Sequence, residues 1–308
     1  MKVGVRGSAF SQVITYAFQF ASLLAYVIVK EKKDNNWAGF SSKLWLDWGT
    51  WFKLGLPGLV MVEMEWTIFE LGTVIAVSAN EFTPDAHVYR FHYILNIWID
   101  SAMCVDIQVP LGFGIATNIR VGQFLGAGSS VGPKSVLSVA LVTVWLLTST
   151  LAMGVFLLRW QLPKAFTSDS DVIELTAHLF PIIAVFQIFD GTSCVCMGAI
   201  RGAGLQFIGA ITCVCSQYLL GVPIALMLIF LAGYGIKGFW IGVAVGFVSQ
   251  AIIYGVVCCC INWKKQVELA RERTKDVRVA VPGGNALDGN GSANSTMAHY
   301  NMSELLLL

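Results

Sequence analysis

Long apolar stretches alternate with short polar ones along most of the chain. A helix needs about 20 mostly apolar residues to cross a lipid bilayer. Seven stretches reach that length, and they cover residues 8–29, 54–79, 88–119, 136–158, 172–199, 207–232 and 236–261. We therefore expect an all-α fold, a polytopic membrane bundle of about seven transmembrane helices.

The composition agrees with this pattern. Hydrophobic residues make up 56% of the chain and charged residues only 13%, whereas roughly a quarter of the residues in a soluble domain are charged. The mean hydropathy is +0.68. We expect the chain to cross a membrane several times, either the plasma membrane or an organelle membrane, with the lipid bilayer as a partner.

The placement of the charges predicts the orientation of the bundle. Lys and Arg accumulate in cytoplasmic loops, and here they gather after the first, third, fifth and seventh stretches. The intervening loops hold Asp and Glu with fewer basic residues, so we expect them to face the opposite side. Lys2 and Arg6 run against this assignment because they precede the first stretch.

Residues 262–308 differ in character from the rest of the chain. They are charged at first, KKQVELARERTKD, then rich in Gly, Asn and Ser, and they end in SELLLL, which is too short to span a bilayer. A segment with so little apolar surface cannot bury enough of it to fold. We therefore expect 262–308 to be a disordered cytoplasmic tail.

Nothing in the sequence points to catalysis. The four histidines are scattered, and neither a Ser/His/Asp set nor an HExxH motif is present. Cysteines two positions apart in a helix lie on opposite faces, which does not suit metal binding. We expect no enzyme activity, no cofactor, no metal and no nucleic-acid partner.

Three carboxylates interrupt the second apolar stretch, where VEMEWTIFELG holds Glu63, Glu65 and Glu70. An acid at a helix centre costs about 2.5 to 3.5 kcal/mol on insertion scales, while each Leu, Ile, Phe or Val returns about 0.3 to 0.6. At 3.6 residues per turn, Glu63 and Glu70 fall nearly in line, and Glu65 lies about 140° from Glu70. Pro57 is expected to bend this segment and let water reach its end.

We interpret Glu63 as a residue near the interface that reaches water or contacts a neighbouring helix. We interpret Glu65 and Glu70 as lining a cavity that exchanges protons and attracts cations, because a carboxyl group removed from water can release and regain its proton near neutral pH. Asp190, in the middle of the fifth stretch with Gln187 one turn before it, supports a pathway shared by two helices.

Several motifs follow one another in order: EWTIFE at 65–70, RVGQFLGAG at 120–128, AFTSDSDVIELTAHLFPIIAVFQIFD at 165–190, GAIRGAGLQFIGA at 198–210, YLLGVPIAL at 218–226 and INWKK at 261–265. Together they resemble the multidrug and toxin extrusion (MATE) transporters. The first motif is most similar to the animal and plant branch of that family. The resemblance covers most of residues 8–265.

The resemblance implies a secondary antiporter that exports organic cations and xenobiotics in exchange for protons. The family has twelve core helices in two six-helix lobes. By motif order, residues 1–29 would be the last helix of the first lobe, 30–53 a cytoplasmic loop between the lobes, and 54–261 the second lobe. The implied partners are organic cations, protons, and either the missing first lobe or another copy of this chain.

The resemblance also implies roles for residues by their position. Glu65 and Glu70 match the paired acids of the family's seventh helix, Asp190 matches a Glu of the tenth, and Tyr218 matches a Tyr of the eleventh. With Gln187, these residues form the expected site for substrate and protons. The residues expected to bend helices or to pack helix ends are Pro57, Arg120, Gly126, Gly128, Arg201, Gly204 and Pro223.

One region departs from the family pattern. Arg90 stands where the family has an acid, and RFHYILNIWIDSAMCVDIQ occupies residues 90–108. We interpret this segment as a mis-assigned exon or an alternative splice rather than a new site. A second function hypothesis follows, a truncated or alternatively spliced membrane protein that does not transport and associates with a full-length relative.

Overall fold

The computed structural model describes residues 4–31, 48–80, 109–165, 170–234 and 236–280. Within these ranges the chain is almost entirely helical, and no strand occurs in them. The chain divides into two compact units, Met1–Lys53 and Leu54–Leu308. The predicted all-α fold is confirmed for the described residues.

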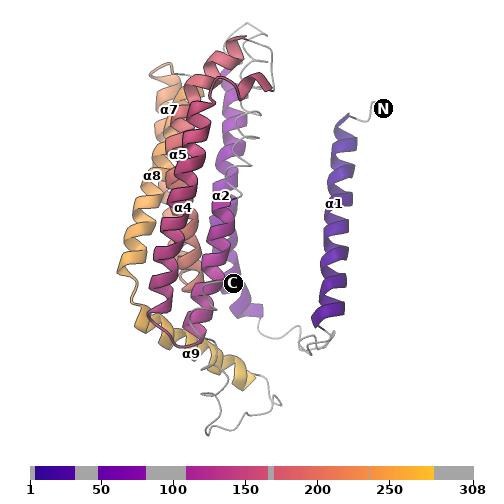
Figure 1. The fold of residues 1–308 in the computed structure, drawn as a ribbon, viewed down its shortest axis with the longest axis vertical. Coiled ribbons are helices and arrows are strands. Elements are labelled where there is room, and N and C mark those ends of the chain that lie inside the picture. Colours follow the sequence, from indigo (N-terminus) through magenta and orange to yellow (C-terminus); the bar gives the residue numbers. More distant parts are fainter. Residues whose placement is uncertain (1–3, 32–47, 81–108, 166–169, 235, 281–308) are drawn as a thin grey trace. The chain divides into compact units, whose positions relative to one another are not determined.

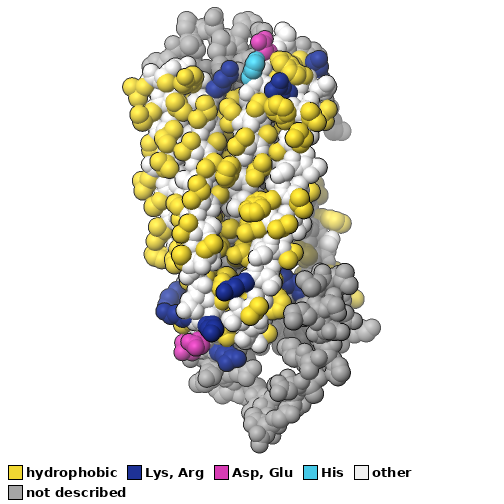
Figure 2. Space-filling model, turned by 60° about the vertical axis from the view of Figure 1, so that its left-hand side comes forward, with side chains coloured by type: hydrophobic (Ala, Val, Ile, Leu, Met, Phe, Trp, Pro, Cys, Tyr) yellow, Lys and Arg dark blue, Asp and Glu magenta, His cyan; other side chains and the backbone are white. Residues whose placement is uncertain are grey.

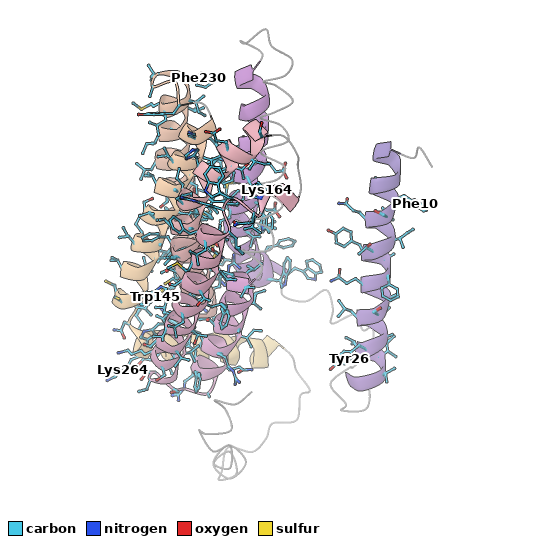
Figure 3. All side chains as sticks on the ribbon, turned by 45° about the horizontal axis from the view of Figure 1, so that its top comes forward. Phe10, Tyr26, Trp145, Lys164, Phe230 and Lys264 are labelled. Atoms are coloured by element: carbon cyan, nitrogen blue, oxygen red, sulfur yellow. The ribbon has the colours of Figure 1, made fainter. Side chains whose placement is uncertain are left out.

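The first unit consists mainly of helix α1 (Gly4–Tyr26), which continues into a π-helical turn, η1 (Val27–Glu31). Ala9–Val29 is long and apolar enough to cross a membrane. Its large apolar side chains are exposed, Phe10 and Tyr26 among them (Figure 3). A helix that is apolar on all sides is suited to lipid or to packing against other membrane helices.

The second unit is a bundle of long helices that lie side by side (Figure 1). They are most of α2 (Trp48–Asn80), a helical segment at 109–126, α4 (Gly132–Leu157), α5 (Ser170–Gly202) and α8 (Ile236–Cys260). A short helix, η3 (Pro163–Ala165), follows α4. The remaining crossing, Gln206–Phe230, is built from α6 (Gln206–Val214), π-helical η4 (Cys215–Gly221) and α7 (Val222–Phe230).

Most predicted apolar stretches coincide with helices. Five helices of the described residues are long and apolar enough to cross a membrane, and they match the predicted stretches 8–29, 136–158, 172–199, 207–232 and 236–261. Helix α2 contains the stretch 54–79 and begins at Trp48, within the segment 30–53 predicted as a loop. The stretch 88–119 is described only from residue 109, so the unusual segment 90–108 lies outside the described residues.

The surface of the second unit has the distribution of side chains expected for a membrane protein. Figure 2 shows hydrophobic side chains across the middle of one face and Lys and Arg at its two ends. Figure 3 places Phe230, at the end of α7, and Lys264, at the start of α9 (Trp263–Ala280), at opposite ends of the bundle. The chain is a multi-pass membrane protein, as predicted.

The prediction of a disordered tail over 262–308 is wrong for its first part, because residues 263–280 form α9. Asn262 begins this helix, and its Oδ1 accepts a hydrogen bond from the Lys265 backbone N–H at 3.2 Å. Trp263, Gln266 and Val267 are buried, a spacing that gives α9 one face against the bundle. The many charges of this segment hid that face in the sequence; residues 281–308 lie outside the described residues.

Two hydrophobic clusters fill the interior of the bundle. We call the first the α7-end cluster, and it includes Ile68, Phe186, Ile229, Trp240 and Phe247. We call the second the α9-end cluster, and it includes Met61, Met197, Tyr254, Trp263 and Val267. On α2, α5 and α8 the two clusters are separated by a short stretch of residues, which contains Glu65, Asp190 and Gln250.

Candidate functional site

The three glutamates of α2 lie on different faces of that helix. Met61 and Ile68 are fully buried, and Glu65, about one turn from each, faces the same side and is half-buried. Glu63 and Glu70 are both exposed. They lie seven residues apart and therefore share a face, so the packing of α2 turns one acid inward and two acids outward.

Asp190 of α5 meets Glu65 at a small cavity inside the bundle. The Asp190 side chain is 5% exposed. The cavity is lined by both acids together with Trp66 and Phe69 of α2 and Phe247 of α8, while Leu111, Cys194 and Met197 are among its other walls. Two carboxyl groups from two helices thus face one space that has aromatic walls.

Glu65 also belongs to a chain of hydrogen bonds that crosses three helices. Gln250 of α8 donates from Nε2 to Glu65 Oε1 at 2.6 Å. Gln217 of η4 donates from Nε2 to Gln250 Oε1 at 3.0 Å. Both glutamines are fully buried. A buried amide is costly when its polar atoms lack partners, so these two hydrogen bonds stabilise the side chains that share them.

Together, Glu65, Asp190, Gln217 and Gln250 form what we call the polar layer. Glu65 lies between Met61 and Ile68 along α2, and Gln250 lies between Phe247 and Tyr254 along α8, so each is flanked by one member of each hydrophobic cluster. The layer is therefore near mid-depth in the bundle. Polar groups at that depth in lipid are costly and mark functional sites more often than structural ones.

The other predicted binding residues lie outside this cavity lining. Glu70 is on the exposed face of α2. Gln187 is buried in α5, and neither atom of its amide has a hydrogen-bond partner within the described residues. The Tyr218 hydroxyl donates to the backbone oxygen of Met64 at 2.9 Å, which ties η4 to α2 directly beside Glu65.

The predicted structural glycines include two that end helices. Gly128 and Gly204 have left-handed φ values of 81° and 78°. After each, the next backbone N–H reaches back to a carbonyl in the last helical turn, Ser129 to Phe124 at 2.9 Å and Leu205 to Ile200 at 3.0 Å. This is the pattern in which a glycine closes a helix C-terminus.

Arginines of α9 cover these two helix ends. A Cβ atom on Gly128 would lie 2.6 Å from Nη2 of Arg271, and one on Gly204 would contact Nη1 of Arg273. Positive charge near the carbonyl end of a helix is favourable. The helix α9 thus rests on the C-terminal ends of the segment 109–126 and of α5.

The structure also places the other residues that were predicted to bend helices or pack helix ends. Gly126 is exposed, and Arg120 is half-buried on the same helical segment. The Nη2 atom of Arg201 lies 3.2 Å from the sulfur of Met197, a residue of the cavity wall. Pro57 lies inside α2, which remains helical through it, and Pro223 opens α7 directly after η4.

Comparison with known proteins shows what the chain is similar to. The MatE family model matches residues 97–227. The mouse protein named multidrug and toxin extrusion protein 2 is 31% identical over 286 residues, which are 92% of this chain and 48% of the relative. The human protein of the same name is 29% identical over 276 residues, or 89% of this chain and 44% of the relative. The crystal structure of the eukaryotic MATE transporter AtDTX14 matches with a TM-score of 0.77 and 27% identity, covering 87% of this chain and 58% of that one.

The chain resembles MATE transporters over most of its length. It spans about half the length of the curated MATE relatives that it matches. The matched region 97–227 contains Asp190 and Gln217 of the polar layer, whereas Glu65 and Gln250 lie outside it. Within the described residues, no group of three or more His, Cys, Asp or Glu is placed to hold a metal ion.

Sequence reasoning missed Gln217 and Gln250 as members of the polar layer. The sequence does contain a signal for each of them. Gln217 in CSQYLLG and Gln250 in VSQAIIY are lone amides in otherwise apolar membrane stretches. A buried amide in lipid calls for a partner as a carboxylate does. The sequence alone does not show which partner, since helices distant in the chain supply it.

Proposed function

We propose that this chain supplies one lobe of a secondary antiporter that exports organic cations and xenobiotics in exchange for protons. The resemblance to MATE transporters supports an efflux transporter. The observation that carries the proposal is the cavity at which Glu65 and Asp190 meet. Its position between two hydrophobic clusters suits a site at mid-depth, where repeat-built transporters bind their substrates.

The electrostatics of the acid pair support exchange. Two carboxylates in one small apolar space repel each other when both are ionised, and either a proton or a cation relieves that repulsion. A proton and a cation then compete for the same negative charge. Competition for one site is the simplest physical basis for exchanging one for the other.

The walls of the cavity favour a cation that is organic. Trp66, Phe69 and Phe247 contribute aromatic rings to the cavity, and Phe69 and Phe247 stack at a centroid distance of 6.0 Å. An aromatic face attracts a cation by about 0.5 to 2 kcal/mol, and more strongly when water is excluded. A small inorganic ion would gain little from these rings.

The exposed acid Glu70 has a separate proposed role. Because it faces away from the cavity, we propose that it attracts the cation on the surface of this lobe before the cation reaches Glu65. Tyr218 would hold α2 in register through Met64, and Gln187 would supply an unpartnered amide to a bound substrate. These roles predict weaker effects on transport for Glu70→Gln than for Glu65→Gln.

Transport in proteoliposomes tests the proposal. The chain is co-reconstituted with the first lobe of a MATE relative, a pH gradient is imposed, and uptake of a fluorescent organic cation is measured. We expect gradient-driven uptake that Glu65→Gln and Asp190→Asn each abolish. Glu63→Gln is the matched control, since it alters an exposed acid of the same helix. Undiminished uptake by both Glu65→Gln and Asp190→Asn would refute the role of the cavity.

The second hypothesis predicts a different result. A non-transporting chain that associates with a full-length relative gives no uptake in any combination with a first lobe. It would instead copurify with the relative and alter that protein's transport. The same vesicles therefore separate the two hypotheses.

A further inference from the structure

The glutamine pair of the polar layer has a feature that a purely structural contact does not need. Gln217 donates its Nε2 to Gln250, but its own Oε1 is buried and has no hydrogen-bond partner among the described residues. Leaving a buried acceptor unpaired is unfavourable, because the oxygen has given up its hydrogen bonds to water without replacing them. A second state of the protein in which Gln217 Oε1 accepts a hydrogen bond would remove this cost.

Helix packing keeps this unpaired oxygen in place. A Cβ atom at Gly246 of α8 would lie 2.5 Å from Gln217 Oε1, so only glycine leaves room for the amide there. Gly221 of η4 also approaches α8, since a Cβ on it would lie 3.2 Å from the Gly246 Cα. The close crossing of η4 and α8 thus fixes both glutamine side chains in contact.

The backbone around Gln217 is unusual as well. Residues Cys215–Gly221 form a π-helical segment within an otherwise α-helical crossing. Such segments are rare and occur frequently at functional sites. The amide chain therefore ends within this π-helical segment, which α7 follows.

We propose that Gln250 and Gln217 are positioning residues that form a reversible amide relay between Glu65 and η4. When Glu65 is ionised, both amides point their N–H groups toward it, as the structure shows. When Glu65 takes a proton from water, its new O–H group donates to Gln250 Oε1, and Gln250 Nε2 donates to Gln217 Oε1. Both amides turn over, and no proton leaves either amide.

The relay deepens the proposed function and rests on it, because it requires Glu65 to be the proton site. The terminal amide of glutamine carries both an acceptor oxygen and an NH2 donor group, so a half-turn about its last side-chain bond exchanges acceptor and donor. Gln217 Oε1 has no hydrogen-bond partner within the part of the chain that the structure describes. In the turned state it accepts a hydrogen bond from Gln250 Nε2. Protonation on α2 is thereby communicated to the π-helical segment of the neighbouring crossing.

Other charged or titratable groups face Glu65 and must be kept constant in a test. Asp190 and Cys194 of α5 share its cavity, and Leu111 of the segment 109–126 contributes no charge to it. Arg201 of α5, Cys213 of α6 and Tyr254 of α8 lie within electrostatic range of Glu65. Glu63 and Glu70 of α2 itself are on exposed faces. The substitutions below leave all of these groups unchanged, apart from the Glu65→Gln reference.

Infrared difference spectroscopy of the full chain in lipid nanodiscs tests the relay without transport. A pH step should produce the carboxyl C=O band of Glu65, identified by its loss in Glu65→Gln, together with changes in two glutamine amide C=O bands. Gln217→Met should remove one amide change and leave the Glu65 band. Gln250→Met should abolish the response of Gln217, although Gln217 is still present.

The titration itself gives a second readout. Gln250 donates to a charged acceptor when Glu65 is ionised, and such bonds are about twice as strong as neutral ones. In Gln250→Met, the pH at the midpoint of the Glu65 band should therefore rise by about one unit. Thr117→Val is the control, because the Thr117 hydroxyl bonds only within its own helix, to Phe113 at 2.7 Å, and it should change neither readout.

The outcomes separate the relay from the proton site. If Glu65 titrates but neither amide band responds, the relay is wrong and the proton site stands. If no Glu65 band appears between pH 5 and 9, both the relay and the proposed proton coupling fail. Should the Met variants not fold, Glu65→Gln decides alone, since it leaves both amides in place and must remove their response to pH.

Discussion

A Cβ atom on Gly198 of α5 would collide with the backbone oxygen of Gly114 in the segment 109–126. The two helices therefore cross with almost no side chain between them, a form of packing common where helices associate in lipid. Gly198 lies about two turns from Asp190 along α5. The crossing sets the position from which Asp190 and Cys194 enter the cavity.

Gly198→Leu should disrupt that crossing. Forcing a large side chain into a packed contact costs about 1 to 3 kcal/mol, so we expect a lower thermal unfolding temperature in detergent. Gly122→Ala is the control on the neighbouring helix, because a Cβ there meets nothing within 4 Å, and alanine favours a helix over glycine. Equal stability of the two variants would show that the crossing is not tight.

The helix end at Gly204 should be equally sensitive to a single methyl group. Gly204→Ala places a side chain on a left-handed residue, at about 1 to 2 kcal/mol, and against Arg273. Gly126→Ala changes the last residue of the segment 109–126, two positions before Gly128, where a Cβ meets nothing within 4 Å, and it should be neutral or slightly stabilising. The measurement is the unfolding temperature of both variants beside the unaltered chain.

Helix α9 should depend on its first residue. Asn262→Ala removes the side-chain oxygen that accepts the Lys265 N–H, at about 1 kcal/mol. We expect faster hydrogen exchange in the first turn of α9, with little change in α8. Asn262→Ser should restore protection, since serine caps helices about as well. Unchanged exchange in Asn262→Ala would mean that burial of Trp263 alone holds the helix.

The orientation predicted from Lys and Arg placement can be checked at two labelled positions. Lys164 and Lys264 are exposed and lie at opposite ends of the second unit (Figure 3). In a background without Cys104 and without the exposed cysteines of the described residues, Cys215, Cys259 and Cys260, an impermeant thiol reagent applied to intact cells should label Lys164→Cys and spare Lys264→Cys. The reverse pattern would invert the topology.

The sequence predicted helix positions better than it predicted which side of each helix faces inward. Apolar stretches mark crossings because lipid demands them, and α4, α5 and α8 agree with the predicted ranges within a few residues. In lipid, however, both the packed and the exposed faces of a helix are apolar. The pattern on α2 therefore gave the angle between Glu65 and Glu70 but not which of them lies in the cavity.

Contacts between distant segments were the other part that the sequence could not supply. Glu65 and Gln250 are 185 positions apart, and only the packing of α2 on α8 brings them together. The charged start of the tail led to the prediction of disorder, because its many charges concealed the buried face of α9. Both errors arise because composition reports the average of a segment, whereas function depends on one face of it.

Proton release on cation binding tests the central claim, that Glu65 and Asp190 form one site for which protons and organic cations compete. The chain, joined with the first lobe of a MATE relative, is placed in lightly buffered nanodiscs, and a pH indicator follows the addition of a lipophilic organic cation. We predict the release of about one proton per cation bound, no release from the Glu65→Gln, Asp190→Asn double variant, and full release from Glu63→Gln. Full release from the double variant would contradict the account.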